Sequence, residues 1–189
     1  MMKKKEHHTI VALVEDRPGV LNKMASKWRQ RGFNIESLAV GHSEIPGLSR
    51  MTFVVDAATT DIEQVVKQVD KLVDVVHIED ITAESMVSRE LALIKVKSTP
   101  QTRSEILQVV DIFRANIVDV TPESLIVEAI GDVDKLESLI KLLEDYGIIE
   151  LCRTGRIAMN RGPSKVGPLD EPQLVLPQLE GGRAEGGLY

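Results

Sequence analysis

Residues 13–40, LVEDRPGVLNKMASKWRQRGFNIESLAV, change their hydrophobic period in a way that decides the fold. The stretch begins as the end of a short apolar run, residues 9–14, whose length suits a single β-strand. From Val20 onward apolar residues recur at helical spacing, in the stripe Val20, Leu21, Met24, Ala25 and Trp28. Gly32 is well placed to end this helix, and a second strand starts at Asn34. The stretch therefore predicts a β-loop-α-β unit.

The loop of this unit, residues 15–19 (EDRPG), is the candidate binding site of the chain. A helix N-terminus offers unpaired N–H groups to a carboxylate, and Gly19 leaves room for a ligand to approach them. Asp16 lies beside these amides and can accept from an ammonium group, so the loop suits a free amino acid. Pro18 is predicted as the first helical residue, where its preset φ is favoured and its missing N–H is not needed. Physical chemistry alone favours a simpler alternative, in which Asp16 is the helix N-cap and Pro18-Gly19 forms a turn.

Composition narrows the class of protein. The chain has 189 residues, enough for one or two small domains, and its net charge of −6 argues against nucleic acid as the main partner. A single cysteine, Cys152, favours a reducing compartment, and the apolar run after the basic start ends at Glu15, too early for a signal or membrane span. A cytoplasmic location is expected. No metal site is predicted, because the four histidines lack ligand spacing: His7, His8, His42 and His77.

The rest of the first 82 residues completes a βαββαβ order. Residues 35–40 continue the second strand, and 49–56 alternate as a half-buried third strand with Met51, Phe53 and Val55 on its inner face. Residues 61–72 have helical periodicity, and the β-branched segment 73–81 predicts the fourth strand. Residues 8–82 are thus predicted to form one ferredoxin-like domain, followed by a polar linker at 83–90.

The same order returns in residues 91–160. Strands are predicted at 91–96, 116–121 and 125–130, with a last strand starting at 148. The inward residues of the first helix are predicted to be Ile106, Leu107, Val109, Val110 and Phe113, and those of the second Val133, Leu136, Leu139, Ile140 and Leu143. The fold class is therefore α+β, with two tandem ferredoxin-like βαββαβ domains. The Pro- and Gly-rich segment 161–189 is predicted to be a flexible tail.

Three function classes use such a sheet. An RNA-recognition module needs stacking aromatics and a basic surface, whereas aromatics here are 3% of residues and the net charge is negative. A small phosphatase-like enzyme needs an arginine in the first loop, which Arg17 can supply, but no paired nucleophile or general base is found. A regulatory module that binds a metabolite at a dimer interface fits the loop chemistry best, since the edges of such sheets pair across a twofold axis.

Six blocks in order, spread over residues 8–162, resemble one family, the small regulatory subunit of acetolactate synthase (acetohydroxyacid synthase). These blocks are Glu15-Asp-Arg-Pro-Gly-Val-Leu21, Arg31-Gly-Phe-Asn-Ile-Glu-Ser-Leu38, Leu48-Ser-Arg-Met-Thr52, Lys71-Leu-Val-Asp-Val75, Phe113-Arg-Ala-Asn-Ile-Val-Asp-Val-Thr121 and Arg153-Thr-Gly-Arg156. The first is shared by many ACT domains, which are regulatory amino-acid-binding modules, whereas the second and fifth are more specific. The resemblance implies an N-terminal ACT domain and a C-terminal ferredoxin-like domain.

The resemblance also implies a function. Such a subunit is not catalytic and holds no cofactor of its own; it activates a large catalytic subunit that uses thiamine diphosphate, Mg and FAD to condense two pyruvates, or pyruvate with 2-oxobutyrate. It confers feedback inhibition by valine or a related branched-chain amino acid. The exposed edges of the predicted sheets, independently of the resemblance, predict a homodimer. The implied effector-binding residues are Asp16, Arg17, Pro18, Gly19, Val20, Leu21, Asn34 and Ile35.

Two points stay open at this level. Relatives often carry Asn at position 16, and because Asp16 can still receive an ammonium, the change is expected to affect which effector is preferred rather than binding itself. The alternative function is an ACT-type amino-acid sensor for another metabolic enzyme.

Overall fold

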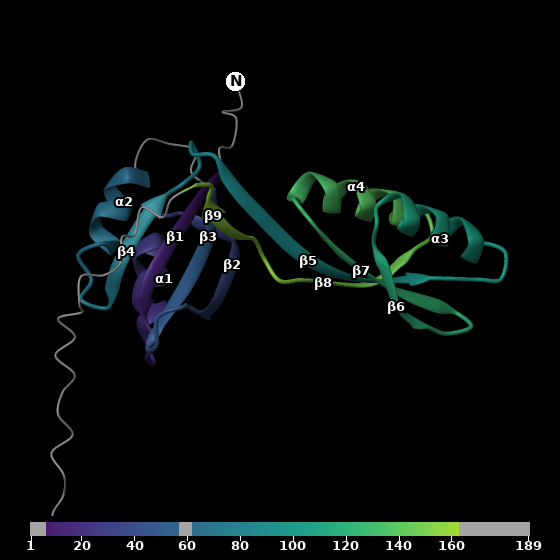
Figure 1. The fold of residues 1–189 in the computed structure, drawn as a ribbon, viewed down its shortest axis with the longest axis horizontal. Coiled ribbons are helices and arrows are strands. Elements are labelled where there is room, and N and C mark those ends of the chain that lie inside the picture. The colour runs from purple at the N-terminus through teal and green to yellow at the C-terminus, as the bar shows by residue number, and fades with distance from the viewer. Residues whose placement is uncertain (1–6, 57–61, 163–189) are drawn as a thin grey trace, which may run out of the picture.

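The computed structural model describes residues 7–56 and 62–162 and contains two similar units joined by extended strands (Figure 1). The first unit comprises β1 (His7–Glu15), α1 (Val20–Gln30), β2 (Asn34–His42), β3 (Leu48–Asp56), α2 (Ile62–Val69) and β4 (Val75–Asp80). Its strands form an antiparallel sheet in the order β2-β3-β1-β4. Most of the predicted tail, residues 163–189, lies outside the described residues.

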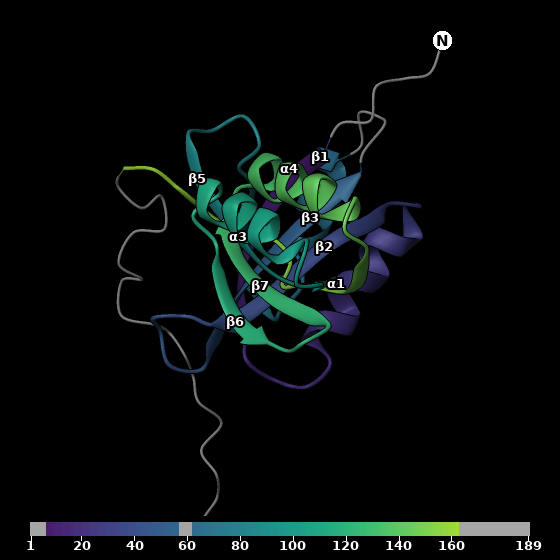
Figure 2. The ribbon, with the colours of Figure 1, turned by 90° about the vertical axis from the view of Figure 1, so that its right-hand side faces the viewer.

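The second unit repeats this arrangement. It comprises β5 (Met86–Lys97), α3 (Arg103–Ile112), β6 (Asn116–Val120), β7 (Ser124–Gly131), α4 (Val133–Glu144), β8 (Ile148–Arg153) and β9 (Ile157–Asn160). The sheet order β6-β7-β5-β8 matches the first unit strand for strand, and Figure 2 shows α3 and α4 side by side over this sheet. The predicted α+β fold with two tandem ferredoxin-like units is confirmed.

Helix α1 packs on the first sheet much as its periodicity predicts. Val20, Met24 and Trp28 are buried, and the Trp28 ring lies 5.7 Å from that of Phe53, centroid to centroid. The helix ends at Gln30, with Arg31 as its C-cap, and Gly32 follows with a φ of 72°, the left-handed conformation expected after a helix. Leu21 was predicted in the inward stripe, and this is wrong: it is 39% exposed.

The sheet of the first unit is covered on both faces, which the sequence pattern did not predict. The face of β3 that carries Met51, Phe53 and Val55 packs on the helices, but Thr52 and Val54 on the opposite face are also only 3% and 4% exposed. Strand β9 lies against β1 and β3 on that side, where Ala158 packs with Val11. The prediction of a half-buried strand is therefore wrong.

Two long strands carry the chain between the units. Residues 83–90, predicted as a linker, contain the first part of β5, which pairs with β9 in the register Met86 to Asn160. The last predicted strand is divided into β8 and β9 by the short segment 154–156. The polar composition of residues 83–90 suggested a linker. The pairing of this segment with β9, about 70 residues later in the chain, leaves no local signal in the sequence.

The helices of the second unit follow their predicted stripes with one exception. Helix α4 begins at a normal N-cap, where the Asp132 carboxylate accepts from the Lys135 N–H at 2.9 Å. Ile106 and Val110 of α3 are buried, but Leu107, predicted to face inward, is 40% exposed. Leu107 directly follows Ile106, so it points about 100° away around the helix and reaches solvent.

Candidate functional site

The N-terminus of α1 lacks the side-chain cap that the simpler sequence interpretation predicts. The N-cap residue is Gly19, with a φ of 90°, which has no side chain with which to cap the helix. Pro18 precedes this residue, so its prediction as the first helical residue is wrong, as is the prediction of Asp16 as the N-cap. The first turn also carries no acidic residue. The positive end of the α1 dipole is therefore left without a carboxylate of its own helix.

The β1–α1 loop, residues 15–19, is held at its ends and open in its middle. The Asp16 N–H donates to the Gly47 carbonyl at 2.9 Å, and the Lys23 N–H donates to the Gly19 carbonyl at 3.0 Å. A Cβ built on Gly19 meets no atom within 4 Å, and residues 16–19 are exposed. The exposed Leu21 side chain adds an apolar surface beside this space. A small ligand can therefore reach the start of α1.

Asp16 follows the last residue of β1 and lies beside the end of β2. Its carboxylate is 3.2 Å from the Nδ1 atom of His42, the last residue of β2, and both side chains are partly or largely exposed. The predicted acceptor for an ammonium group is thus next to the edge strand of the sheet and accessible from outside.

Arg17 is paired within the chain. Its Nε lies 2.7 Å from a Glu15 oxygen, and its other end donates to Asp74, whose second oxygen accepts from Lys23 Nζ at 2.6 Å. The hydrogen bond from Lys23, together with the bond and charge of Arg17, holds the pKa of the Asp74 carboxyl below its ordinary value against the effect of burial. We call Glu15, Arg17, Lys23 and Asp74 the Asp74 cluster. Arg17 therefore has its charge balanced, which weakens the phosphatase-like alternative.

Asn34 and Ile35 lie at the other end of the sheet. Asn34 is opposite Asp56 at the end of β3, whereas Glu15 is opposite Leu48 at its start. Eight residues of extended β3 separate these positions, or about 26 Å. Val20 is buried in the core of the first unit. Ile35 is half-buried and packs against this core, while Asn34 is exposed. The structure thus brings the predicted residues 16–21 together but does not bring Asn34 or Ile35 to them within one chain.

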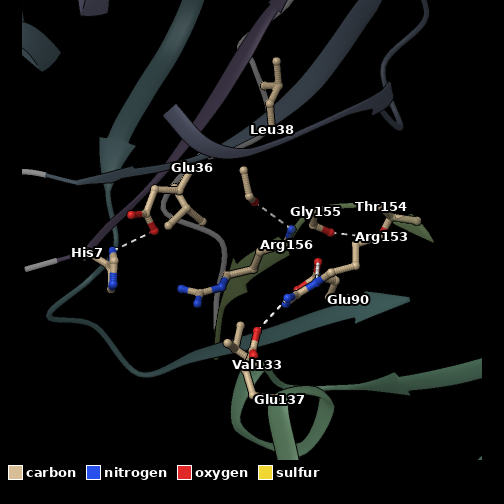
Figure 3. Close-up of a pocket in the computed structure, with 12 residues that line it drawn as sticks. His7, Glu36, Leu38, Glu90, Val133, Glu137, Arg153, Thr154, Gly155 and Arg156 are labelled. Carbon is tan, nitrogen blue, oxygen red and sulfur yellow. Dashed lines mark hydrogen bonds and ion pairs between the residues drawn. The ribbon is translucent and has the colours of Figure 1, made fainter. Parts of the chain in front are cut away.

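A second cavity, of about 580 Å³, lies between the two units (Figure 3). Arg153 at the end of β8 donates to both oxygens of Glu90 at 2.8 Å and to Glu137 of α4 at 2.6 Å, and these bonds raise its pKa. The Arg156 N–H donates to Ser37 Oγ at 3.0 Å, which ties the segment to β2. A Cβ on the neighbouring glycine, Gly155, would lie 3.0 Å from a β2 carbonyl, so this close approach requires glycine.

The sequence did not predict the ion pairs of Arg17 with Asp74 and of Arg153 with Glu90. Asp74 and Arg153–Arg156 occur in blocks that carry the family resemblance, but no role was predicted for either, because Arg17 and Asp74 are 57 residues apart and Glu90 and Arg153 are 63 apart. Among residues 7–56 and 62–162, no helix is long and apolar enough to cross a membrane. In the same ranges, no three His, Cys, Asp or Glu side chains lie close enough to hold a metal ion.

The first unit, with its βαββαβ sheet and open β1–α1 loop, is an ACT domain. A family model described as the AHAS small subunit-like ACT domain matches residues 10–77, and a model of the small subunit of acetolactate synthase matches residues 89–162.

Known proteins agree with these models over most of the chain. The acetolactate synthase small subunit of Mycobacterium bovis is 51% identical over 160 residues, covering 85% of this chain and 95% of that protein. The Bacillus subtilis small subunit is 49% identical over 154 residues, or 81% and 90% of the two chains. The crystal structure of the Thermotoga maritima small subunit superimposes with a TM-score of 0.76 at 43% identity, covering 84% of this chain and 99% of that one. The chain belongs to the family of acetolactate synthase small subunits.

Proposed function

We propose that the chain is the non-catalytic regulatory subunit of an acetolactate synthase. It activates a large catalytic subunit, which carries thiamine diphosphate, Mg and FAD, and makes that enzyme sensitive to valine or a related branched-chain amino acid. The observation that carries the proposal is the open start of α1, whose N-cap is a glycine, beside Asp16, in a chain of this family. The α1 amides suit a carboxylate, Asp16 suits an ammonium, and the exposed Leu21 suits a branched apolar side chain.

The effector site is completed by a second copy of the chain. β2 is an edge strand of the first sheet, with its N-terminal Asn34 far from its own loop. If two β2 strands associate antiparallel across a twofold axis, the start of one strand lies beside the end of the other. The end of β2 is His42, which contacts Asp16. Asn34 of the partner subunit would therefore reach the β1–α1 loop and bond the polar head of the effector.

The isolated chain is expected to be a homodimer that forms no acetolactate. The β2 edge of the first sheet supports the first part, and the match to acetolactate synthase small subunits supports the second. Analytical ultracentrifugation measures the mass, and a pyruvate consumption assay measures the activity. A stable monomer at micromolar concentration would contradict the dimer, and pyruvate turnover by the chain alone would contradict the regulatory assignment.

The proposal as a whole is tested by reconstitution with a large catalytic subunit. Addition of the chain should raise acetolactate formation, and valine should lower it again. If the chain co-purifies instead with an unrelated enzyme and leaves acetolactate synthase unchanged, the alternative of an ACT-type sensor for another enzyme holds.

Asn34→Ala is expected to weaken valine binding by about 1–3 kcal/mol, because a polar group of the effector loses its partner. The matched control is Asn116→Ala, which changes the equivalent asparagine of the second unit; there the side chain donates to Glu128 at 3.2 Å, far from the proposed site. Isothermal titration calorimetry on the full chain gives both affinities. Equal affinities for the two variants would show that Asn34 is not part of the site.

A further inference from the structure

Asp74 is a buried carboxylate that no predicted role explains. It lies in the turn before β4, and its side chain is 2% exposed although the groups that it binds are about half exposed. Its carbonyl oxygen accepts from the Glu15 N–H at 2.9 Å, at the start of the β1–α1 loop. Its two carboxylate oxygens accept from Arg17, in the middle of the loop, and from Lys23, in the first turns of α1. Asp74 therefore holds the loop at Glu15 and Arg17 and binds the start of α1 through Lys23.

The loop has few other contacts to fix it. Residues 16–19 are exposed, and Gly19 has the left-handed φ of 90°, which costs glycine little but gives the loop wide conformational freedom. At the first end of the loop, the Glu15 N–H donates to the Asp74 carbonyl and the Asp16 N–H donates to the Gly47 carbonyl. An effector that needs the loop in one conformation binds less tightly in proportion to the fraction of molecules that have another.

The charges of Arg17, Lys23 and the α1 dipole also favour a role for Asp74 in holding the loop. Arg17 and Lys23 flank the N-terminus of α1, which is itself the positive end of the helix dipole. Without Asp74 these two cations would face each other and the helix end, with Glu15 still beside Arg17. With Asp74 in place, Arg17 and Lys23 both donate to its carboxylate, and the space where a Cβ of Gly19 would lie is open to 4 Å.

We propose that Asp74 is the positioning residue of the β1–α1 loop: it clamps Arg17 and Lys23 and so holds the loop in the conformation that receives the effector. This inference rests on the proposed function, because the effector itself is part of it. Asp74 does not contact the open space above Gly19, so it acts through the loop and not on the ligand directly.

The test compares Asp74→Asn with Asp70→Asn, which changes an exposed aspartate four residues earlier in the same turn region. Asn keeps the shape of the Asp74 side chain but removes its charge. Valine binding to the full chain, measured by calorimetry, is expected to weaken about tenfold in Asp74→Asn, as it would if about a tenth of the loops kept the bound conformation. Asp70→Asn should bind like the unchanged chain. Fluorescence of Trp28, the single tryptophan, verifies that the ACT core of each variant is folded.

A double-variant cycle separates positioning from a general loss of stability. Lys23→Met keeps the side-chain stem but removes the donor to Asp74, and it should also weaken valine binding. The double variant should be no worse than Asp74→Asn alone, because the two changes break one interaction. Full additivity, or unchanged affinity in Asp74→Asn, would overturn the inference while leaving the proposed function intact.

Hydrogen exchange in the absence of effector gives a readout that does not depend on valine. The amides of residues 16–22 should exchange faster in Asp74→Asn than in Asp70→Asn, and those of β3 should be unchanged. If the unchanged chain binds no branched-chain amino acid, the proposed function fails, and this exchange experiment alone decides whether Asp74 orders the loop. Equal exchange in the two variants would refute the positioning role.

Discussion

Gly19→Asp should remove feedback by valine while acetolactate formation by the reconstituted complex stays nearly normal. The new carboxylate would occupy the open space above Gly19 and the positive end of α1, where the carboxylate of the effector is proposed to bind. An anion at a helix N-terminus contributes up to about 2 kcal/mol, so the valine concentration for half inhibition should rise by up to about 30-fold. The measurement is acetolactate formation across a valine titration.

The backbone conformation of Gly19 means that this substitution also adds strain. Gly19 is not a helical residue but has a φ of 90°, so any side chain there costs about 1–2 kcal/mol of conformational strain. The ACT domain should still fold, which Trp28 fluorescence would verify. Gly19→Asn is the matched control, since it has the same shape and similar strain without the charge, and it should reduce feedback less. If Gly19→Asp retains normal feedback, the loop does not receive the effector carboxylate.

Arg153→Met is expected to lower the free energy of unfolding by about 3 kcal/mol, because it leaves the buried Glu90 carboxylate without its partner. Glu90 is only 6% exposed and receives two hydrogen bonds from this one guanidinium. Urea unfolding followed by far-UV circular dichroism measures the change.

Two further variants locate the cause of this loss. Adding Glu90→Gln to Arg153→Met should restore much of the stability, because no unpaired charge then remains buried. Glu137→Gln removes the more exposed partner of Arg153 and should cost less than about 1 kcal/mol. Similar losses for Glu137→Gln and Arg153→Met would show that burial of Glu90 is not the cause.

The sequence predicted those parts of the fold that depend on local pattern. Helix α1 begins at Val20, where the hydrophobic period changes, and it ends two residues before Gly32. Strands β2 and β6 begin at the repeated asparagines, Asn34 and Asn116. The error at Leu21 has a physical origin outside this local pattern. Leu21 fits the stripe of α1, but its exposure depends on what the loop leaves open beside it, which a one-dimensional pattern does not contain.

The candidate site was predicted only in part for the same reason. Residues 16–21 form one continuous loop and helix start, so their spacing was enough to bring them together. The Asp74 contact to Arg17 closes a gap of 57 residues and depends on the turn before β4, for which the sequence offers no periodic signal. The role of Asn34 depends on a second chain, so it stays a prediction that the calorimetry described above can test.

The packing of β9 on the first sheet has a consequence for biosynthesis. A nascent chain emerges from the ribosome N-terminus first, so the ACT domain appears well before residues 157–160 exist. Until then, the sheet face around Val11 lacks Ala158, and Thr9 lacks the hydrogen bond that it receives from Arg156 at 2.9 Å. The ACT domain is therefore translated first but completes its packing last, once β9 has been made. The two units then reach their final structure together and not one after the other.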